Sequence, residues 1–315
     1  MSILVLSACA HHPSLTPSAN NSAVLSSSID TTTLSLSEAK FGLAAVNDGS
    51  FIYVLGGSSQ RGLSGDIEII DLQTNEVSIL SNKIIPRRYF SAVFDGRESV
   101  YIIGGLSVKN KRPRREFQVE VFNTRTHEVS FIERLKVPTR TNTAVFHDNN
   151  IYVLGGSILT PAGTLATPWT FMFSIESQQW SKLADMPTAK STKAIVKDNY
   201  IYVVGGYDEK SAMQVFERFD ISNQQWETLP SLPKGISAHS LVSIEDRIFT
   251  FGNYDDLNDV FVYDYLTESW QAADFGYLPS RHNAATAVGN DIYVIGGTVK
   301  SRGGALKLIQ KLSVQ

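Results

Sequence analysis

The chain has 315 residues, a formal net charge of −3 and 43% apolar residues. A net charge this close to zero gives no bulk attraction to nucleic acid, so nucleic-acid binding is not expected. The single cysteine, Cys9, excludes an internal disulfide, and no apolar run reaches the roughly 20 residues of a membrane-spanning helix. The length suits one large globular domain with a polar tail.

The N-terminal residues are similar to a bacterial lipoprotein signal. Leu6-Ser7-Ala8-Cys9 matches the lipobox, in which cleavage precedes a cysteine that then carries the lipid. The apolar run is short and no Lys or Arg precedes it, so we expect a positively charged segment upstream of Met1. We interpret residues 1–8 as the remainder of a signal and predict an outer-membrane lipoprotein facing the periplasm, with the lipid as its membrane contact. The alternative is a frayed apolar N-terminus.

Residues 9–29 are poor in charge and rich in Ser, Asn and Pro. Such a composition cannot bury enough apolar surface to become ordered. We predict a flexible tether between the lipid and the globular part of the chain.

A short apolar run that ends in two glycines, or in Gly-Asn in the fifth copy, occurs six times. The copies lie at residues 52–57, 100–105, 151–156, 201–206, 248–253 and 292–297. Successive first glycines are 44 to 51 residues apart. Short β-branched and aromatic runs ending in glycine predict buried strands, and a period near 50 residues predicts a repeat architecture.

Each copy is flanked by further short strands at regular positions. An upstream strand is joined to it by a turn such as Asp48-Gly49. Downstream, an aromatic residue is followed seven residues later by a tryptophan in three copies: Phe173 with Trp180, Phe219 with Trp226 and Tyr263 with Trp270. Four short antiparallel strands per repeat are typical of β-propeller blades.

The run ending in Gly-Gly, the spaced aromatic and the tryptophan resemble the Kelch repeat. The resemblance implies an all-β, six-bladed Kelch-type β-propeller over residues 30–315. The sixth copy stops before a fourth strand, so we expect residues 30–37 to supply its outer strand and close the ring. Kelch propellers serve mostly as interaction modules and only occasionally as enzymes. We expect a monomer without a cofactor.

Basic residues begin several inner strands. Aligning the repeats on the alanine in the inner strand places Arg88, Arg140, Lys190 and Arg281 at one repeat position. Equivalent positions around a ring converge on its mouth, so we predict that these four residues bind an anionic ligand there. Trp169, in a long connection on the same face, could stack on a sugar ring. Alternatively, the basic residues pair with carboxylates of neighbouring blades and Trp169 covers the third blade's core.

Two functions remain open. The first is a non-catalytic extracytoplasmic binding module for an anionic carbohydrate or another glycan, or for a protein partner. The alternative resembles the periplasmic sialic-acid mutarotases and epimerases, with Glu209 or Asp208 as acid or base. No metal site is expected: His239 matches Asn283 in the repeat register, so His239 and His282 should point to opposite faces of their sheets.

Overall fold

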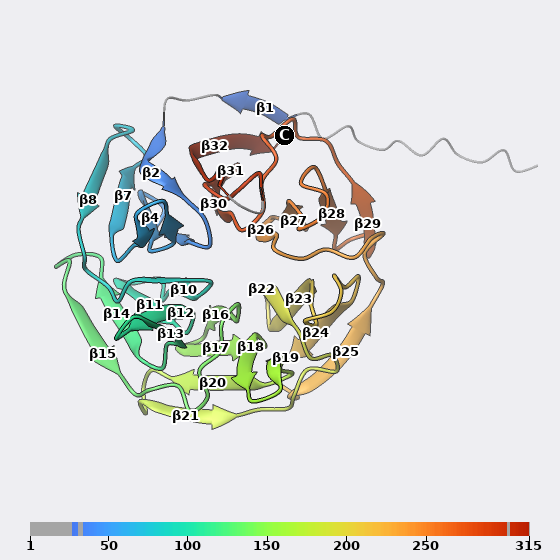
Figure 1. Ribbon diagram of the computed structural model, residues 1–315. Helices are drawn as coiled ribbons and strands as arrows, with labels where there is room; N and C mark the ends of the chain where they lie inside the picture. The colour runs from blue at the N-terminus through green and yellow to red at the C-terminus, as the bar shows by residue number, and fades with distance from the viewer. Residues whose placement is uncertain (1–26, 31–33, 301–302, 315) are drawn as a thin grey trace, which may run out of the picture.

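The computed structural model describes residues 27–30, 34–300 and 303–314. Six antiparallel sheets, or blades, form a ring in which the first strand of each blade lies nearest the axis (Figure 1); five blades have four strands and the sixth has five. The all-β, six-bladed propeller predicted from the repeats is thereby confirmed. Within the described ranges, no helix is long and apolar enough to cross a membrane.

Blades 1 to 3 each follow the chain order from the inner to the outer strand. Blade 1 consists of β3 (Ala44–Asn47), β4 (Phe51–Leu55), β7 (Ile67–Asp71) and β8 (Val77–Leu80). Blade 2 consists of β10 (Ser91–Phe94), β11 (Ser99–Ile103), β14 (Val119–Asn123) and β15 (Val129–Ile132). Blade 3 consists of β16 (Thr143–His147), β17 (Asn150–Leu154), β20 (Thr170–Ser174) and β21 (Gln179–Lys182).

Blades 4 and 5 repeat this order, and blade 6 takes its first three strands from the C-terminal end of the chain. Blade 4 consists of β22 (Ser191–Lys197), β23 (Tyr200–Tyr207), β24 (Phe216–Asp220) and β25 (Gln225–Leu229). Blade 5 consists of β26 (Ser240–Ile244), β27 (Arg247–Phe251), β28 (Val260–Asp264) and β29 (Ser269–Ala272). Blade 6 contains β30 (Ala284–Val288), β31 (Asp291–Ile295) and β32 (Leu306–Val314).

The N-terminal segment closes blade 6, as expected, but with a different range. The outermost strand is β1 (Ser27–Asp30), which pairs with β32 from Ser27↔Val314 to Asp30↔Lys311. The chain then enters β2 (Ser35–Lys40), which pairs with the beginning of β32. The expected outer strand, 30–37, is displaced because Leu34 and Leu36 are buried between blades 6 and 1. An outer edge facing water could not bury both leucines.

Small hairpins extend the connections between second and third strands. They are β5 (Ser58–Ser59) with β6 (Gly62–Leu63), β12 (Leu106–Lys109) with β13 (Arg112–Arg115), and β18 (Ser157–Thr160) with β19 (Gly163–Ala166). A short strand, β9 (Arg87–Arg88), pairs with β12. The basic run in residues 109–115 therefore lies largely in a hairpin. Its turn residues Asn110 and Lys111 both have positive φ, as a two-residue hairpin turn requires.

The hydrophobic cores lie between neighbouring blades. Ile52 and Val54 of blade 1, for example, pack with Tyr293 and Ile295 of blade 6. The second strands are buried on both faces because each sheet is covered by two neighbours, which explains their unbroken apolar runs.

The glycine pairs allow adjacent blades to approach closely. Gly155 has a φ of 58°, and a Cβ there would lie 2.3 Å from the carbonyl oxygen of Lys190. The N–H of Gly156 donates to that same oxygen at 3.0 Å. The pair thus joins blade 3 to the entry of blade 4, and any larger residue at Gly155 would push them apart.

Candidate binding cavity at the propeller mouth

Five residues form an inner ring, which we call the collar, where the chain enters the first strands of blades 1, 2, 3, 5 and 6. Each has a left-handed φ between 51° and 64°: Gly42, Tyr89, Thr141, Ala238 and His282. Their backbones are joined from blade to blade by hydrogen bonds of 2.7–2.8 Å, in which His282 donates to Ala238, Gly42 to His282, Tyr89 to Gly42 and Thr141 to Tyr89.

Blade 4 has no collar residue. In blade 3, the carbonyl of Thr139 accepts from the N–H of Gly105, and Thr143 pairs with Leu154. Thr143 therefore lies four residues after Thr139. In blade 4 the matching residues are Lys190 and Lys193, and Lys193 lies only three residues after Lys190. The strand pairing shifts between Ser191 and Lys193. The collar is therefore one residue short. Within the described part of the chain, the carbonyl of Thr141 and the N–H of Ala238 have no hydrogen-bond partner.

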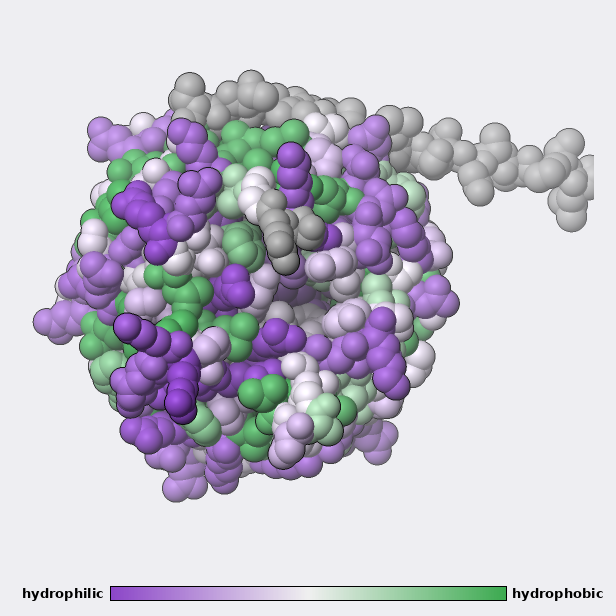
Figure 2. Space-filling model, in the orientation of Figure 1, coloured by the Kyte–Doolittle hydropathy of each residue, from purple (hydrophilic) through white to green (hydrophobic). Residues whose placement is uncertain are grey.

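A cavity of about 530 Å³ lies at this mouth, and all five collar residues line it. Figure 2 shows the hollow at the centre of the face, with hydrophilic residues around it. Residues from all six blades contribute. Blade 4 supplies the largest share: Ser191, Thr192, Lys193, Gly206, Tyr207, Glu209, Lys210, Ser211 and Ala212.

Two predicted residues, Arg140 and Glu209, meet in this cavity. Arg140 Nη2 lies 3.3 Å from Glu209 Oε2, and its Nε donates to Ser157 Oγ at 3.1 Å. The pair is partly shielded, with 29% and 17% of the two side chains exposed. Arg140 is thus held at the wall of the cavity, as expected for a mouth cation, with one carboxylate beside it.

Lys193 is a cavity cation that the sequence reasoning did not single out. It lies on β22, and desolvation lowers the pKa of its amine. Within the described ranges, no carboxylate lies within ion-pair distance of it. Lys193 is half-buried, and an ammonium there without a counter-charge loses part of its hydration and gains no ion pair in return.

Two histidines also line the cavity. His239 is 1% exposed, and among the described residues its ring nitrogens make no hydrogen bond of normal geometry, the backbone of Val204 being a weak partner. Desolvation, with the charge of Lys193 as the next cause, lowers the pKa of His239 to about 3. His282 is a collar residue whose pKa is also lowered to about 3, mainly by desolvation. Both rings are therefore neutral at physiological pH.

The register relation of these histidines is the one the repeats predicted. Ala238 matches His282 in the collar, so His239 matches Asn283. Among the described residues, no group of three His, Cys, Asp or Glu side chains could hold a metal ion.

Two further predicted arginines are held by aromatic rings at the rim. The guanidinium of Arg281 lies 3.8 Å from the ring centroid of Tyr254, and its Nη1 donates to the carbonyl of Tyr254. Arg88 lies 5.1 Å from the Tyr89 ring and 5.5 Å from the Phe41 ring. The charges of both arginines act on the imidazole of His282, which places them within electrostatic range of the cavity.

Lys190 does not share this position, and its predicted place at the mouth is corrected. Its side chain is fully buried and forms an ion pair with Glu217. Because blade 4 lacks the collar residue, counting back from the inner-strand alanine reaches Lys190 one position too early. The blade-4 residue that matches Arg140 is Ser191, which pairs with Tyr207 as Arg140 pairs with Ser157.

Lys190 instead belongs to a set of three equivalent buried ion pairs. In each, a cation at the entry of a blade meets a glutamate in that blade's third strand: Lys40 with Glu68, Arg87 with Glu120, and Lys190 with Glu217. The glutamates also fix the segment that leads into each blade. Glu68 accepts a hydrogen bond from the N–H of Ser37, and Glu217 accepts one from the hydroxyl of Thr188.

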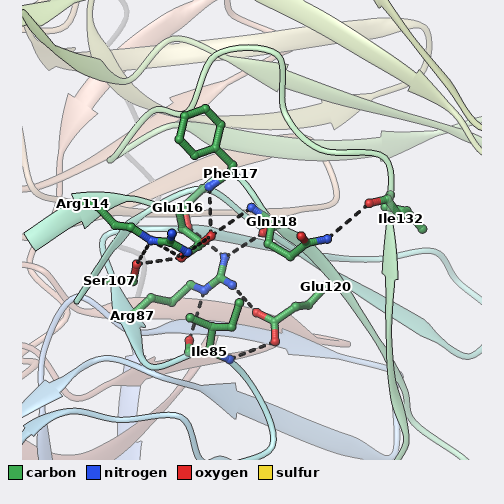
Figure 3. A network of polar contacts seen from close by, with 10 residues as sticks. Ile85, Arg87, Ser107, Arg114, Glu116, Phe117, Gln118, Glu120 and Ile132 are labelled. Carbon is green, nitrogen blue, oxygen red and sulfur yellow. Dashed lines mark hydrogen bonds and ion pairs between the residues drawn. The ribbon is translucent and has the colours of Figure 1, made fainter. Parts of the chain in front are cut away.

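Figure 3 shows this arrangement in blade 2. Arg87 points to Glu120, whose other oxygen accepts the N–H of Ile85 at 2.9 Å. Arg87 also donates to the carbonyls of Ile85 and Gln118 at 3.2 and 3.3 Å. The entry cation is therefore fully satisfied inside the protein and is not available to a ligand.

Trp169 and Asp208 lie outside the cavity lining. Trp169 borders a small recess with Leu135, Val137 and Phe171, which agrees with the alternative that it covers the third blade. Asp208 Oδ1 accepts the N–H groups of Lys210 and Ser211, and these bonds lower the pKa of its carboxyl. Asp208 thus shapes the turn that carries Glu209. Cys9 and residues 1–26 lie outside the described residues.

Comparisons with known proteins agree with this fold. The model described as the KLHDC2/KLHL20/DRC7 Kelch-repeats domain matches residues 42–253 and 141–309. Kelch-like protein 38 of Rattus norvegicus is 24% identical over 78% of this chain and 42% of its own length. Kelch-like protein terF of Aspergillus terreus is 28% identical over 67% of this chain and 50% of its own length. Alpha-scruin of Limulus polyphemus is 26% identical over 62% of this chain and 23% of its own length. The chain thus spans half or less of these relatives. Kelch repeats generally mediate protein–protein binding, and this chain belongs to the Kelch-repeat family.

Proposed function

We propose that the propeller is a non-catalytic binding module whose mouth cavity takes an acidic segment of a partner protein. The observation that carries the proposal is Lys193, a half-buried ammonium in the cavity wall without a carboxylate partner among the described residues. An anionic group of a ligand would supply the missing counter-charge. Such a charge-assisted bond is stronger in a shielded site than on an open surface.

The charges around the cavity support an anionic ligand. Three cations line it, Arg140, Lys193 and Lys210, against the two carboxylates of Glu209 and Asp255. One of these carboxylates, Glu209, is already paired with Arg140. The rim arginines add further positive charge. The cavity therefore favours a carboxylate and disfavours a cation.

A titration of the full chain with blocked peptides tests this function. A glutamate-containing peptide should bind more tightly than its glutamine counterpart, and binding should weaken as salt rises. Lys193→Met should cost about 1.5–3 kcal/mol of binding free energy, the range for a charge-assisted hydrogen bond. Lys83→Met, at an exposed lysine outside the lining, is the control. Equal binding of both peptides, or an unchanged Lys193→Met variant, would reject the proposal.

The same titration can be repeated with anionic carbohydrates in place of the peptides. Sialic acid and uronic-acid oligosaccharides carry the carboxylate that Lys193 would recognise. If they bind through Lys193 and acidic peptides do not, the partner is a glycan.

One observation keeps the enzyme alternative in view. Glu209 lies in the cavity beside Arg140 and has a φ of 72°, a conformation that costs free energy in a residue other than glycine. A mutarotase would accelerate the exchange of N-acetylneuraminate anomers, which NMR measures directly. An acceleration that Glu209→Gln removes would favour the enzyme, and exchange at the uncatalysed rate would favour the binding module.

The proposal includes a lipid anchor at Cys9 that places the propeller in a bacterial cell envelope. It rests on the Leu6–Cys9 motif and on Ala10, since a residue other than Asp after the cysteine directs such proteins to the outer membrane. With a functional signal upstream, the chain should incorporate labelled palmitate and sediment with membranes. Membrane binding that persists in Cys9→Ser would contradict the anchor.

A further inference from the structure

The gap in the collar has the hydrogen-bonding pattern of one missing amino-acid residue. Gly42, Tyr89 and His282 each use the backbone N–H toward one neighbouring blade and the carbonyl toward the other. A blade-4 collar residue would donate its N–H to the carbonyl of Thr141 and accept from the N–H of Ala238. These are the two backbone groups left without a partner in the described part of the chain.

We propose that a peptide segment of the partner inserts one of its own residues into this gap. The N–H of that residue donates to the carbonyl oxygen of Thr141, and its carbonyl oxygen accepts from the N–H of Ala238. The ligand must therefore present an N–H and a C=O on either side of one tetrahedral carbon, which is the repeating unit of a peptide. This inference rests on the proposed function for the partner being a protein, and it specifies how that partner is held.

The surroundings of the gap are built for such a residue. Thr141 and Ala238 both line the cavity, as do Ser191 and Thr192, between which the missing residue would stand. The hydroxyls of Thr141 and Ser191 are bonded to each other at 2.8 Å, so both are already engaged beside the gap. The backbone groups of Thr141 and Ala238 are what remains for a ligand.

The side chain of the inserted residue would meet two polar groups of the cavity wall. Lys193 lies two residues after the gap in the chain, and the ring of His239 makes no hydrogen bond of normal geometry among the described residues. A glutamate or aspartate side chain could accept from the ammonium of Lys193, beside the neutral ring of His239. The peptide residue at the gap is therefore acidic.

Three peptides separate this inference from the proposed function. They are Ac-Ala-Glu-Ala-NH₂, the same peptide with Gln, and the same peptide with N-methylated Glu, each titrated into the full chain and followed by backbone amide shifts. We expect the Glu peptide to bind at least tenfold more tightly than either of the others. Removing the N–H leaves the carbonyl of Thr141 unbonded, and removing the charge leaves Lys193 unpaired.

The outcomes are distinguishable. Equal binding of the Glu and N-methyl-Glu peptides, with weaker Gln binding, retains the anionic site and overturns the insertion. Equal binding of Glu and Gln, with weaker N-methyl-Glu, retains the insertion and overturns the anionic site. Indifference to both changes, with only solvent exchange at Ala238, means that water fills the gap and overturns both.

Inserting one glycine between Ser191 and Thr192 should complete the collar from within. The variant should melt at or above the temperature of the parent and bind the Glu peptide at least tenfold more weakly. A glycine inserted between Asn223 and Gln224, in an exposed turn of the same blade, is the matched control. Unchanged peptide affinity in the collar variant would overturn the insertion.

Hydrogen exchange in the unaltered chain tests the gap even if the insertion variant does not fold. The Ala238 amide should exchange faster than the bonded collar amides of Gly42, Tyr89 and Thr141, and the Glu peptide should slow it. If Ala238 is as protected as these amides in the free protein, or if the bound peptide leaves its exchange unchanged, the inference is wrong.

Discussion

The buried ion pair between Lys190 and Glu217 gives a quantitative test of the blade-entry assignment. The two side chains are 0% and 1% exposed. Glu217→Ala leaves the ammonium uncompensated, which for buried pairs costs about 3–5 kcal/mol. It also removes the hydrogen bond from Thr188 Oγ, worth about 1 kcal/mol. Against a typical stability of about 5–15 kcal/mol, this variant should be severely destabilised.

In blade 5 the positions equivalent to Lys190 and Glu217 are held by two apolar residues, which suggests a compensating double substitution. Ile236 occupies the entry position, its carbonyl accepting from Gly206, and Phe261 stands at the glutamate position. The double variant Lys190→Ile/Glu217→Phe should therefore regain most of the lost stability, to within about 1–2 kcal/mol of the parent, because apolar replacement of a buried pair is often neutral.

The double-mutant cycle consists of the parent, Lys190→Ile, Glu217→Phe and the double variant, with the free energy of unfolding of each measured by chemical denaturation. A large favourable coupling energy is expected, since each single change leaves a buried group unpaired. If the double variant loses the sum of the single losses, the interchangeability of the two solutions is refuted.

Three further predictions concern the cavity and the closure. Because the pKa of His239 is about 3 in the folded chain against 6.5 unfolded, the unfolded state binds the proton first. Below pH 6.5, His239 should lower the free energy of unfolding by about 1.4 kcal/mol per pH unit. His239→Asn, which introduces the amino acid present at the equivalent position 283, should reduce this slope in acid denaturation. Deleting residues 1–34 should lower the melting temperature by several degrees, since it removes β1 and the buried Leu34, whereas deleting 1–26 should leave it nearly unchanged. Lys193→Ser should raise the stability of the free protein while weakening peptide binding, and lower stability would contradict an unpaired charge.

The propeller could be predicted from the sequence because its determinants are local. Strand length, turn residues and the glycine pairs repeat at fixed spacing and need no tertiary information. The aromatic and tryptophan seven residues apart become direct cross-strand partners, with ring centroids of Phe173 and Trp180 5.0 Å apart. The range of the closing strand was missed because it depends on where Leu34 and Leu36 are buried, a tertiary property.

The candidate site was predicted less well because its register depends on one absent residue. Arg140 lines the cavity and Arg281 packs on Tyr254 beside it, but Lys190 was placed at the mouth by an alignment that assumes inner-strand entries of equal length. A usable signal was present in the third strands, where a glutamate directly follows the strand's first apolar residue in three repeats: Glu68, Glu120 and Glu217. Those are the repeats that begin with a buried cation, so comparing repeats pairwise would have identified the ion pairs.

The same comparison separates Lys193 from these structural charges. Its position, paired with the last residue of the apolar run, is held by small residues in the other five blades: Ala44, Ser91, Thr143, Ser240 and Ala284. Blade 4 alone places a long cation there, and blade 4 alone lacks the collar residue. Each change leaves groups without partners in the free protein, and both face the same cavity. These two costs lie within two residues of each other, and neither is offset inside the described chain. One ligand that supplies a counter-charge and a backbone unit explains both.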